Sequence, residues 1–516
     1  MSKAEHVALV ERAAAVSSAG KNSPTDSKSL GSCSNTLTPY DIAGPRFAAY
    51  SPAVVAGIVP SIEVALVLLI GLVCYRWLSG GASDDFARYC VNSMGMSLLT
   101  LVAFKFADIE HLNAFRNPDK QYLRLTLAWS IVFFIVIELA RFTGVDDGIS
   151  TLWLISYYLA GLVVLIAFRG VLGLLTRRWT RQGRFDRCTV LVGGGKHTEA
   201  LLAQLTKEPD SDVRIIGVFD DRGEDRSPLA YHGIPKLGKV NDLVEFARQI
   251  RVDLVLVVLP ITAEERILQM LKKLWVLPLD IRLVAHGNKL QFRPRSYSYI
   301  GNVPAFDVFD KPIANWDLVA KWLVDKIIGT VALISTAPII VMIALAIKLE
   351  SKGPVFFKQG RHGFNNNIFD IYKFRSMYVE HADPMARNVV TRNDPRVTRV
   401  GRFLRKTSLD ELPQLLNVVF IGNMSLVGPR PHAVYGTTEG QLYDDAIDGY
   451  FARHRVKPGI TGWAQIHGLR GGTDSNEKIQ RRVEYDLYYI ENWSILFDLW
   501  ILMRTPFALI RGENAY

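Results

Sequence analysis

Four long apolar stretches dominate the first third of the chain. They cover about residues 54–78, 89–107, 122–142 and 149–168, and short polar segments separate them. A helix needs about 20 residues to cross the roughly 30 Å hydrocarbon core of a bilayer. Since four such runs with short loops are rare in soluble helical bundles, the pattern predicts a region of four transmembrane helices over residues 51–170.

The residues before the first stretch have a different composition. Residues 1–50 are rich in Ser, Ala, Thr and Asn, and they lack the apolar segment of a signal peptide. We therefore expect a flexible N-terminal tail.

The charged loops predict which helix ends face the cytoplasm. The first and third loops carry the acidic residues Asp84, Asp85, Asp146 and Asp147. The second loop and the segment that follows residue 169 are rich in Lys and Arg. Because basic loops stay on the cytoplasmic side, we expect the tail, the second loop and everything after about residue 169 to be cytoplasmic.

The middle of the chain alternates between apolar runs and amphipathic stretches. The runs at 188–192, 213–221, 253–260 and 280–284 are typical of buried strands, and helical patterns lie between them. Strands that alternate with helices form a parallel sheet. We therefore predict a Rossmann-like α/β domain at residues 185–290, followed by a linker at 291–320.

A glycine-rich turn follows the first of these strands. Gly193, Gly194 and Gly195 occupy the place of a dinucleotide-binding fingerprint, and an acidic pair ends the second strand: Asp220 and Asp221. The third fingerprint position is Thr198 instead of Gly or Ala, which weakens the signal. Two interpretations stay open: a structural or regulatory domain, which we favour, and a nucleotide-binding domain.

A fifth apolar segment, at residues 327–347, is also long enough to span a bilayer. Lysines lie on both sides of it, at positions Lys321, Lys326, Lys348 and Lys352. This favours a cytoplasmic location for both flanks. Ser335, Thr336 and Pro338 lie in the middle, where proline removes a backbone donor. We therefore expect a re-entrant helix at 325–349 that is broken near Pro338, in preference to a kinked full span.

The overall charge is basic. The 516 residues include 60 Lys and Arg against 50 Asp and Glu, a formal net charge of +10. Such a chain favours an anionic partner; nucleic acid, anionic lipid and phosphorylated substrates are all open on charge alone. The four cysteines are scattered without a Cys-x-x-Cys spacing, so they indicate neither a disulfide framework nor a zinc site.

Six cations lie within fifteen residues of the last third of the chain: Arg392, Arg396, Arg399, Arg402, Arg405 and Lys406. Such a cluster is typical of a basic face beside anionic lipid. It also suits a phosphate site, because the guanidinium fork matches phosphate oxygens. No interleaved row of aromatic residues accompanies it, so nucleic-acid binding is not expected.

Two carboxylates follow directly. Asp410 and Glu411 precede Pro413, and the pattern after the proline is helical. Proline fits only in the first turn of a helix, which places Asp410 at or near the N-cap. Backbone N–H groups and the helix dipole would then favour the ionised carboxylate, a candidate nucleophile for a phosphorus electrophile. An ordinary capping Asp with a first-turn Glu is the alternative.

The motifs around this pair resemble those of a known family. They are GPVFFKQGRHG (353–363), KFRSM (373–377), DPRVTRVGRFLRKTSLDELPQLLNVVFIGNMSLVGPRP (394–431), KPGITGWAQ (457–465) and YDLYYIENWSILFDLWIL (485–502). In this order they are similar to the bacterial sugar transferases, the polyprenyl-phosphate hexose-1-phosphate transferases. The four spans and the Rossmann-like, CoA-binding-like domain resemble the long form of this family, which includes undecaprenyl-phosphate glucose and galactose phosphotransferases.

The resemblance implies a fold and a reaction. The fold is a membrane α-helical bundle, a cytoplasmic Rossmann-like domain and a membrane-associated α+β catalytic domain at 321–516 with a re-entrant helix. A UDP-sugar would give its sugar-1-phosphate to undecaprenyl phosphate and release UMP, the first step of exopolysaccharide, capsule or O-antigen synthesis. Glucose is the expected sugar. A galactose-1-phosphate transferase and a catalytically inactive membrane regulator of polysaccharide assembly are the alternatives.

The resemblance also implies residue roles. Asp410 maps onto the family's nucleophile, which forms an aspartyl-phosphosugar intermediate, and Glu411 onto its partner carboxylate, a Mg²⁺ ligand or general base. Four cations match phosphate- and substrate-binding positions: Lys373, Arg375, Arg405 and Arg430. The loop at 459–463 is expected to frame the nucleotide, and an amphipathic stretch at 493–510 to hold the site at the depth of the lipid headgroups.

The implied location is the bacterial inner membrane, with the catalytic domain on the cytoplasmic face and in contact with membrane lipid. We expect a homodimer, and nucleic acid is not an expected partner.

Overall fold

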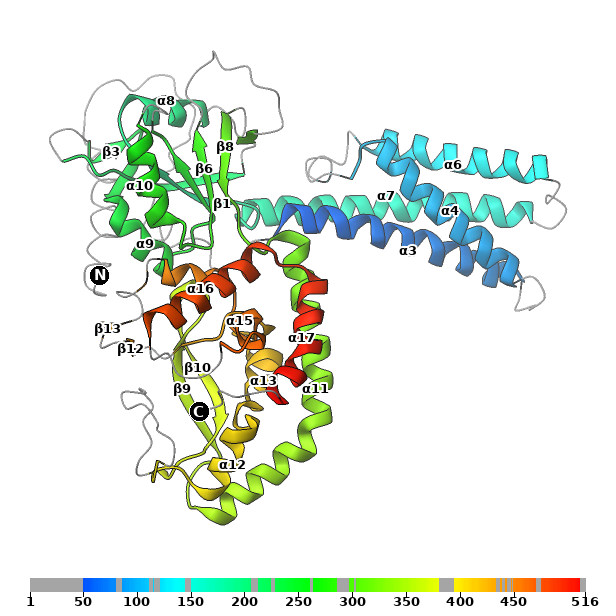
Figure 1. Cartoon of the computed structure of the whole chain (residues 1–516). Coiled ribbons are helices and arrows are strands. Elements are labelled where there is room, and N and C mark those ends of the chain that lie inside the picture. Colours follow the sequence, from blue (N-terminus) through cyan, green and yellow to red (C-terminus); the bar gives the residue numbers. More distant parts are fainter. Residues whose placement is uncertain are drawn as a thin grey trace. The chain divides into compact units, whose positions relative to one another are not determined.

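Figure 1 shows the computed structural model of the chain. It forms two compact units, Pro45–Asp186 and Arg187–Tyr516. The structure describes residues 50–79, 86–110, 115, 121–143, 150–205, 212–223, 228–259, 263–284, 297–300, 303–379, 394–432, 437–438, 441–442, 447, 449–469 and 475–510.

The unit Pro45–Asp186 contains four long apolar helices, as the apolar pattern predicts. They are α3 (Pro52–Ser79), α4 (Phe86–Phe106), α6 (Tyr122–Thr143) and α7 (Thr151–Arg181). Each has the length and composition that a membrane span requires. Helix α7 continues well beyond residue 168, where the apolar stretch ends. The predicted tail, apart from Tyr50, lies outside the described residues, and so do the acidic loop residues Asp84, Asp85, Asp146 and Asp147.

Polar contacts cross the interior of this bundle. The Trp153 indole donates a hydrogen bond to the Gly71 carbonyl at 2.9 Å. Arg169 of α7 pairs with Glu63 of α3 at 2.6 Å, and both side chains are buried. Removing one member of a buried ion pair leaves an uncompensated charge, so this pair constrains how α3 packs against α7.

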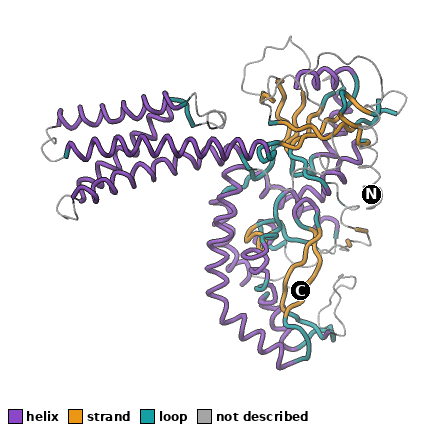
Figure 2. Tube along the Cα trace, turned by 180° about the vertical axis from the view of Figure 1, so that it is seen from behind, coloured by secondary structure: helices purple, strands orange, loops and turns teal. Residues whose placement is uncertain are grey.

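The middle of the chain folds into a Rossmann-like domain, as predicted. Its strands are β1 (Arg187–Val192), β2 (Val213–Phe219), β3 (Ala230–Tyr231), β4 (Ile234–Gly238), β5 (Leu254–Val257), β6 (Asp280–Val284), β7 (Tyr297–Ile300) and β8 (Val303–Phe309). The strand order is β3-β4-β2-β1-β5-β6-β8-β7. Figure 2 draws the strands in orange. The run from β4 to β6 is parallel, and the outer strands join antiparallel. Helices α8 (Lys196–Leu205), α9 (Val240–Gln249) and α10 (Glu264–Leu274) connect the strands.

Part of the predicted linker at 291–320 belongs to this sheet. Strands β7 and β8 lie inside that range, and β8 pairs with β6. Val303 and Ala305 of β8 are buried, whereas Pro304 and Phe306, which point to the other face of the sheet, are only partly buried. This alternation is typical of an antiparallel strand with one solvent-facing side, not of the continuous apolar run by which the parallel strands are recognised.

The last part of the chain mixes helices with short strands. Its elements are α11 (Asn315–Glu350), β9 (Phe356–His362), η4 (Phe364–Asn366), β10 (Ile368–Phe374), α12 (Arg399–Thr407), η6 (Leu409–Glu411), α13 (Gln414–Leu416), η7 (Asn417–Ile421), β11 (Ser425–Val427), β12 (Thr437–Thr438), β13 (Gln441–Leu442), η8 (Tyr450–Arg455), β14 (Gly459–Thr461), α15 (Trp463–Ile466), α16 (Asn476–Glu491) and α17 (Ile495–Ile510). Strands β9 and β10 form a hairpin, and β11 pairs with β14 in parallel.

Helix α11 contains the fifth apolar segment and is continuous. The expected break is therefore absent: the backbone stays helical through Ser335, Thr336 and Pro338. The two hydroxyls donate hydrogen bonds to the Ala332 carbonyl, at 3.0 and 2.7 Å. Such bonds and an internal proline bend a helix without ending it, and α11 is visibly curved in both views (Figures 1 and 2).

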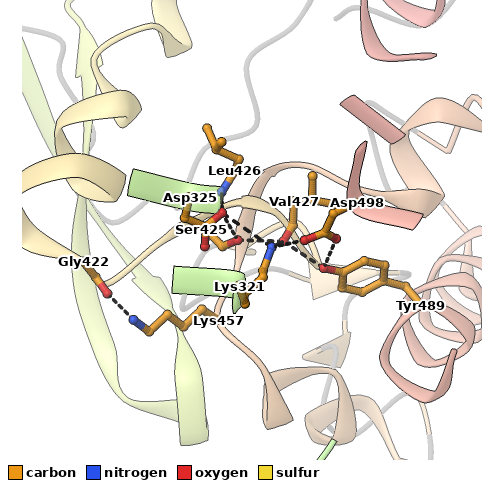
Figure 3. A network of polar contacts seen from close by, with 9 residues as sticks. All are labelled: Lys321, Asp325, Gly422, Ser425, Leu426, Val427, Lys457, Tyr489 and Asp498. Atoms are coloured by element: carbon orange, nitrogen blue, oxygen red, sulfur yellow. Dashed lines mark hydrogen bonds and ion pairs between the residues drawn. The ribbon is translucent and has the colours of Figure 1, made fainter. Parts of the chain in front are cut away.

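Both ends of α11 bind the same folded region. Near the N-terminal end, Lys321 pairs with Asp498 of α17 at 2.6 Å (Figure 3). At the C-terminal end, the Glu350 carboxylate accepts hydrogen bonds from the backbone N–H groups of Arg399 at 2.7 Å and Val400 at 3.1 Å, at the start of α12. The helix therefore lies along this region, and apolar residues between its two ends pack against the region as well.

Candidate active site

The predicted carboxylates lie between two helices. Helix α12 ends at Thr407, and Ser408 adopts a left-handed backbone (φ 58°) that turns the chain into the short 3-10 helix η6. Asp410 lies within η6, whose N-cap is Ser408. Asp410 is therefore near a helix start, as expected, but it is not the capping residue, and α13 begins only after Pro413.

Glu411 is the centre of an ion-pair cluster. Its buried carboxylate accepts a hydrogen bond from Lys373 Nζ at 3.0 Å and a bidentate pair from Arg430 at 2.6 and 3.1 Å. Lys373 lies on β10, and Arg430 lies in the loop after β11. Three segments far apart in the sequence thus meet at one carboxylate, and the bidentate geometry fixes the direction of the guanidinium.

Asp410 lies beside this cluster in a different electrostatic environment. Burial raises the pKa of the Asp410 carboxyl group and is the largest influence on it. The positive charge of Lys373 opposes this shift, and the negative charge of Glu411 adds to it. The charges of Arg405 and Arg430 oppose it more weakly. The direction of this shift is opposite to the one expected from backbone N–H groups and the helix dipole, because loss of water outweighs the nearby cations.

Arg375 differs from the other predicted phosphate ligands. Its side chain is buried, and it donates hydrogen bonds to the Ser351 carbonyl and hydroxyl, both at 2.8 Å, and to the Lys352 carbonyl at 2.7 Å. These bonds fix the chain that leaves α11 against the end of β10. The geometry gives Arg375 a structural role at the end of α11, whereas Lys373 and Arg430 contact Glu411.

Asn417 is a positioning residue that the sequence reasoning missed. Its fully buried side chain accepts a hydrogen bond from the Tyr372 N–H at 3.0 Å and donates one to the Asp370 carbonyl at 2.8 Å. These bonds hold the strand that carries Lys373 against the helix that follows Asp410. A signal was present, since a polar amide inside the apolar run LLNVV (415–419) must find hydrogen-bond partners when it is buried.

A buried polar network fixes the strand that leads to Arg430 (Figure 3). Lys321 donates hydrogen bonds to the Val427 carbonyl at 2.9 Å and to Asp498 at 2.6 Å. The Tyr489 hydroxyl donates to Asp498 at 2.8 Å and lies 3.1 Å from the same Val427 carbonyl. Val427 is the last residue of β11, so α11, α16 and α17 together position the loop that follows.

The two glycine–proline loops lie against each other, as rigid turns. The Gly428 N–H donates to the Thr461 carbonyl at 2.9 Å, and the Gly459 N–H donates to the Pro429 carbonyl at 3.0 Å. A Cβ atom on Gly428 would approach the Lys457 carbonyl oxygen to 2.5 Å, and one on Gly459 would approach the Gly428 nitrogen to 2.1 Å. Side chains at these two glycines would separate the loops.

Trp463, in the loop expected to frame the nucleotide, packs among aromatic residues. Its ring stacks on Tyr488, with 5.9 Å between centroids, and meets Phe497 edge-on at 4.9 Å. The indole therefore contributes to the packing of α15 against α16 and α17.

A second buried network holds the backbone of Arg430. Arg453 of η8 is fully buried, pairs with Asp486 at 2.6 Å and donates a hydrogen bond to the Arg430 carbonyl at 2.7 Å. The His432 ring lies 2.7 Å from the other terminal nitrogen of Arg453. Burial and the neighbouring arginines lower the pKa of His432 well below its usual value, so the neutral ring can accept this hydrogen bond.

The predicted cation cluster divides into two parts. Arg396 pairs with Asp394 at 2.6 Å and lowers the pKa of Asp394 to about 2. Three cations on α12 are exposed: Arg399, Arg402 and Lys406. The apolar Phe403 side chain is exposed beside them, a combination typical of helices at a membrane surface. Arg392 lies outside the described residues.

Asp410 and Glu411 are the candidate metal ligands. Among the residues that the structure describes, no group of three or more His, Cys, Asp or Glu side chains could enclose a metal ion. Mg²⁺ commonly binds one or two carboxylates and completes its shell with water and substrate phosphates. Two adjacent carboxylates, Glu411 buried and Asp410 half-buried, are a donor set that fits Mg²⁺.

Comparison with known proteins assigns the chain to a class. The model of the bacterial sugar transferase family matches residues 316–512, which include Asp410, Glu411 and the cations around them. A CoA-binding domain model matches residues 105–285. The chain belongs to the bacterial sugar transferase family, and the predicted enzyme class, a sugar-phosphate transferase, is confirmed.

Full-length relatives carry the same assignment. The chain is 33% identical over 480 residues to the UDP-glucose:undecaprenyl-phosphate glucose-1-phosphate transferase of Xanthomonas campestris pv. campestris, a match that covers 92% of the chain and 98% of the relative. It is 32% identical over 475 residues to the protein of the same name from Klebsiella pneumoniae, with 91% and 99% covered. The exopolysaccharide production protein PSS of Rhizobium leguminosarum bv. phaseoli is 46% identical over 199 residues, 38% of the chain and 99% of the relative.

Proposed function

We propose that the chain transfers glucose-1-phosphate from UDP-glucose to undecaprenyl phosphate and releases UMP. The observation that carries this proposal is the buried constellation in which Lys373 and Arg430 bind Glu411 beside Asp410. It joins a nucleophile to cations that suit phosphate oxygens. The names of the full-length relatives support glucose as the sugar and undecaprenyl phosphate as the acceptor.

The first half-reaction forms a covalent intermediate. The Asp410 carboxylate attacks the phosphorus that carries the sugar, and the bond from this phosphorus to the bridging oxygen of UMP breaks. UMP leaves with that oxygen and its electron pair, and an aspartyl-phosphosugar remains. A carboxylate stripped of water is a stronger nucleophile once it is ionised, which is consistent with the burial of Asp410.

The second half-reaction regenerates the enzyme. A phosphate oxygen of undecaprenyl phosphate attacks the same phosphorus, and the bond between that phosphorus and Asp410 breaks. The product is a lipid-linked diphosphate sugar, and the carboxylate is restored. Because both half-reactions use one nucleophile in turn, the proposal implies ping-pong kinetics.

The cations neutralise phosphate charge while the carboxylates orient them. Glu411 holds Lys373 and Arg430 in place, so that their remaining donors face the phosphate oxygens without a change of conformation. Asp410 and Glu411 would hold Mg²⁺, which when bound supplies additional positive charge to the transferred phosphate. Arg405, close enough to influence Asp410, is the third cation of this set.

We place the site at the cytoplasmic face of the inner membrane. Both ends of helix α11 bind one domain, Lys321 through Asp498 and Glu350 through the backbone at the start of α12. This supports a helix that enters and leaves one leaflet over a full span, whose ends would lie on opposite sides of the bilayer. Apolar side chains exposed on α17 support contact with lipid: Leu496, Met503 and Phe507.

The proposed product would start exopolysaccharide synthesis. The relative named exopolysaccharide production protein PSS matches this chain over 99% of its own length, which supports this assignment.

The test uses the purified full-length chain, undecaprenyl phosphate, Mg²⁺ and a panel of UDP-sugars, with UMP release as the readout. We expect release with UDP-glucose and its loss on chelation. Incubation with UDP-glucose labelled in the sugar, without acceptor, should label the protein, and Asp410→Asn should abolish the label. Release with UDP-galactose alone would change the sugar, and no release with any sugar would refute the proposal in favour of a regulatory protein.

A further inference from the structure

The Rossmann-like domain contains a cavity of about 350 Å³ at the carboxyl ends of β1, β2 and β5. The glycine turn at 193–195 lines it together with three apolar residues: Val258, Leu259 and Met270. Gly193 and Gly195 have φ values of 107° and 91°, which only glycine adopts without strain. The sheet order reverses between β1 and β5, the place where open α/β sheets bind ligands.

The rim of the cavity is cationic. Lys196, Arg222 and Arg266 line it, and Lys196 and Arg266 are exposed, so their side chains can turn toward a ligand. Several cations around a glycine turn suit phosphate oxygens, which accept hydrogen bonds from side chains and from backbone N–H groups alike. The cavity therefore combines a place for phosphate with an apolar wall for a flat ring.

The two acids at the end of β2 are engaged by the protein itself. Buried Asp220 accepts hydrogen bonds from the Tyr231 hydroxyl at 3.3 Å and from the Arg222 N–H at 3.2 Å. Asp221 accepts one from the Val240 N–H, at the start of α9, at 2.9 Å. In dinucleotide sites an acid at this position binds ribose hydroxyls. Here the acids shape the cavity, and recognition is left to the cations and the apolar wall.

Helix α9 connects the cavity with the catalytic domain. It begins at Val240, which lines the cavity, and is about 15 Å long. Near its other end, the Ala247 carbonyl accepts a hydrogen bond from the Asn365 side chain of η4 at 2.9 Å. The next residue, Arg248, lies over the Phe451 ring of η8 at 4.9 Å.

Helix α10 has the same arrangement. Arg266 and Met270 line the cavity, and Trp275 follows the last residue of the helix. A Cβ atom on Gly449 would lie 2.3 Å from the Trp275 ring, so the start of η8 packs directly on this tryptophan. Helix η8 carries Arg453, whose guanidinium donates a hydrogen bond to the backbone carbonyl of Arg430. The side chain of Arg430 pairs with Glu411.

We propose that this cavity binds a nucleoside diphosphate, free or as part of a coenzyme, and that the bound ligand increases sugar-phosphate transfer. The ligand bridges the glycine turn and α10, and it thereby holds α9 and α10 in place. These helices contact η8, and η8 in turn positions Arg430 through Arg453. This is a coupling between two distinct sites. The regulatory half rests on the proposed function, whereas the binding half does not.

Binding is tested with the full-length Asp410→Asn chain in lipid nanodiscs, so that the result stands whatever the enzyme transfers. Calorimetry with ADP, coenzyme A and UDP should give saturable binding of at least one of them. The double variant Lys196→Ala/Arg266→Ala should weaken it about tenfold or more. Lys272→Ala, an exposed cation of α10 away from the cavity, is the matched control and should leave it unchanged.

The three ligands distinguish the sources. Tighter binding of coenzyme A than of ADP identifies a coenzyme, and equal or tighter binding of ADP or UDP identifies a free nucleotide. Saturable binding of none of them, or binding that survives the double substitution unchanged, would overturn the site.

Coupling is tested with the active chain. ADP, or whichever of the three binds, should raise the rate of UMP release several-fold at subsaturating UDP-glucose. Arg248→Ala removes the contact with Phe451 and should keep the ligand affinity while it abolishes the increase. A rate that does not respond to the bound ligand, or that responds equally in Arg248→Ala and in the double variant, would refute the coupling.

Discussion

The catalytic and Rossmann-like domains each place two adjacent carboxylates beside a glycine-rich loop and several cations, yet they use the carboxylates in opposite ways. In the Rossmann-like domain, Asp220 and Asp221 accept hydrogen bonds from nearby backbone N–H groups. In the catalytic domain, Glu411 binds cations from distant segments, and Asp410 is half-buried with a raised pKa. An acidic pair is thus structural where backbone N–H groups donate hydrogen bonds to its carboxylates. It is a candidate reactive site where loss of water raises the pKa of one carboxylate despite the nearby cations.

The largest test of this comparison removes one acid from each pair. Asp410→Asn should lower the rate of UMP release by about 10³-fold or more, because the amide cannot form the covalent intermediate. Asp220→Asn should leave that rate within about twofold and lower the stability by about 1 kcal/mol, because it weakens bonds to Arg222 and Tyr231. Rates and melting temperatures of both variants in one lipid preparation check the pair. Equal losses of rate would mean that the two acidic pairs do not differ as argued.

A second test concerns Asp498, a buried carboxylate of the catalytic domain that is paired with a cation. Lys321→Met leaves Asp498 buried without its partner at 2.6 Å, and it should lower the free energy of unfolding by about 3–5 kcal/mol. The double variant Lys321→Met/Asp498→Leu should recover most of this loss, because no unpaired charge remains. Thermal unfolding of the single and double variants measures both. A double variant no more stable than Lys321→Met would contradict the assignment of the loss to an unpaired charge.

The sequence predicted those parts of the structure whose burial shows directly in the apolar pattern. The apolar stretches and the strand–helix alternation report burial directly, so the four helices of the first unit and strands β1, β2, β5 and β6 were predictable. Strand β8 was not, because its alternation includes Pro304 and exposed Asp307 and lacks a continuous apolar run. The break expected at Pro338 is a curve instead: the backbone stays helical through the proline, and an internal proline can bend a helix without ending it.

The candidate site was predictable as a set of residues but not as a geometry. The motifs placed Asp410, Glu411, Lys373 and Arg430 in one region, and the structure joins the last three by ion pairs. The pKa of Asp410 depends on burial by segments far away in the sequence, so a local helix argument gave the wrong direction. Arg375 shares a motif with Lys373, two residues away, yet it points to the end of α11.

A third test separates these two kinds of cation. Arg375→Lys keeps the charge but loses part of a three-bond arrangement with Ser351 and Lys352, so stability should fall by about 1–2 kcal/mol while the KM for UDP-glucose stays unchanged. Arg430→Lys is the matched variant: it loses the bidentate bond to Glu411 and should raise KM or lower kcat about tenfold. Thermal unfolding and initial rates measure both. A tenfold rise of KM in Arg375→Lys would restore it to the phosphate-binding set.

The smallest expected effect is on the pH dependence of stability. It tests directly whether burial raises the pKa of Asp410. Burial raises the pKa of Asp410 above its ordinary 3.8, so the native state binds this proton more readily than the unfolded state. Ionised Asp410 therefore destabilises the fold above its raised pKa, and this cost disappears as the pH falls through that value toward 3.8. Asp410→Asn should melt at a higher temperature than the parent at neutral pH, and the gain should shrink on acidification.

Asp394 gives the opposite sign in the same domain. Its pKa is lowered to about 2 by Arg396, so its ionised form stabilises the fold above pH 3.8, and this contribution is lost as the pH falls toward 2. Asp394→Asn should therefore melt lower than the parent at neutral pH, and the difference should narrow on acidification. Melting temperatures of both variants and the parent across this range, without Mg²⁺, measure the two trends together. If Asp410→Asn also melts lower than the parent at neutral pH, burial is not the largest influence on the pKa of Asp410. The two acidic pairs would then not differ in the way argued above.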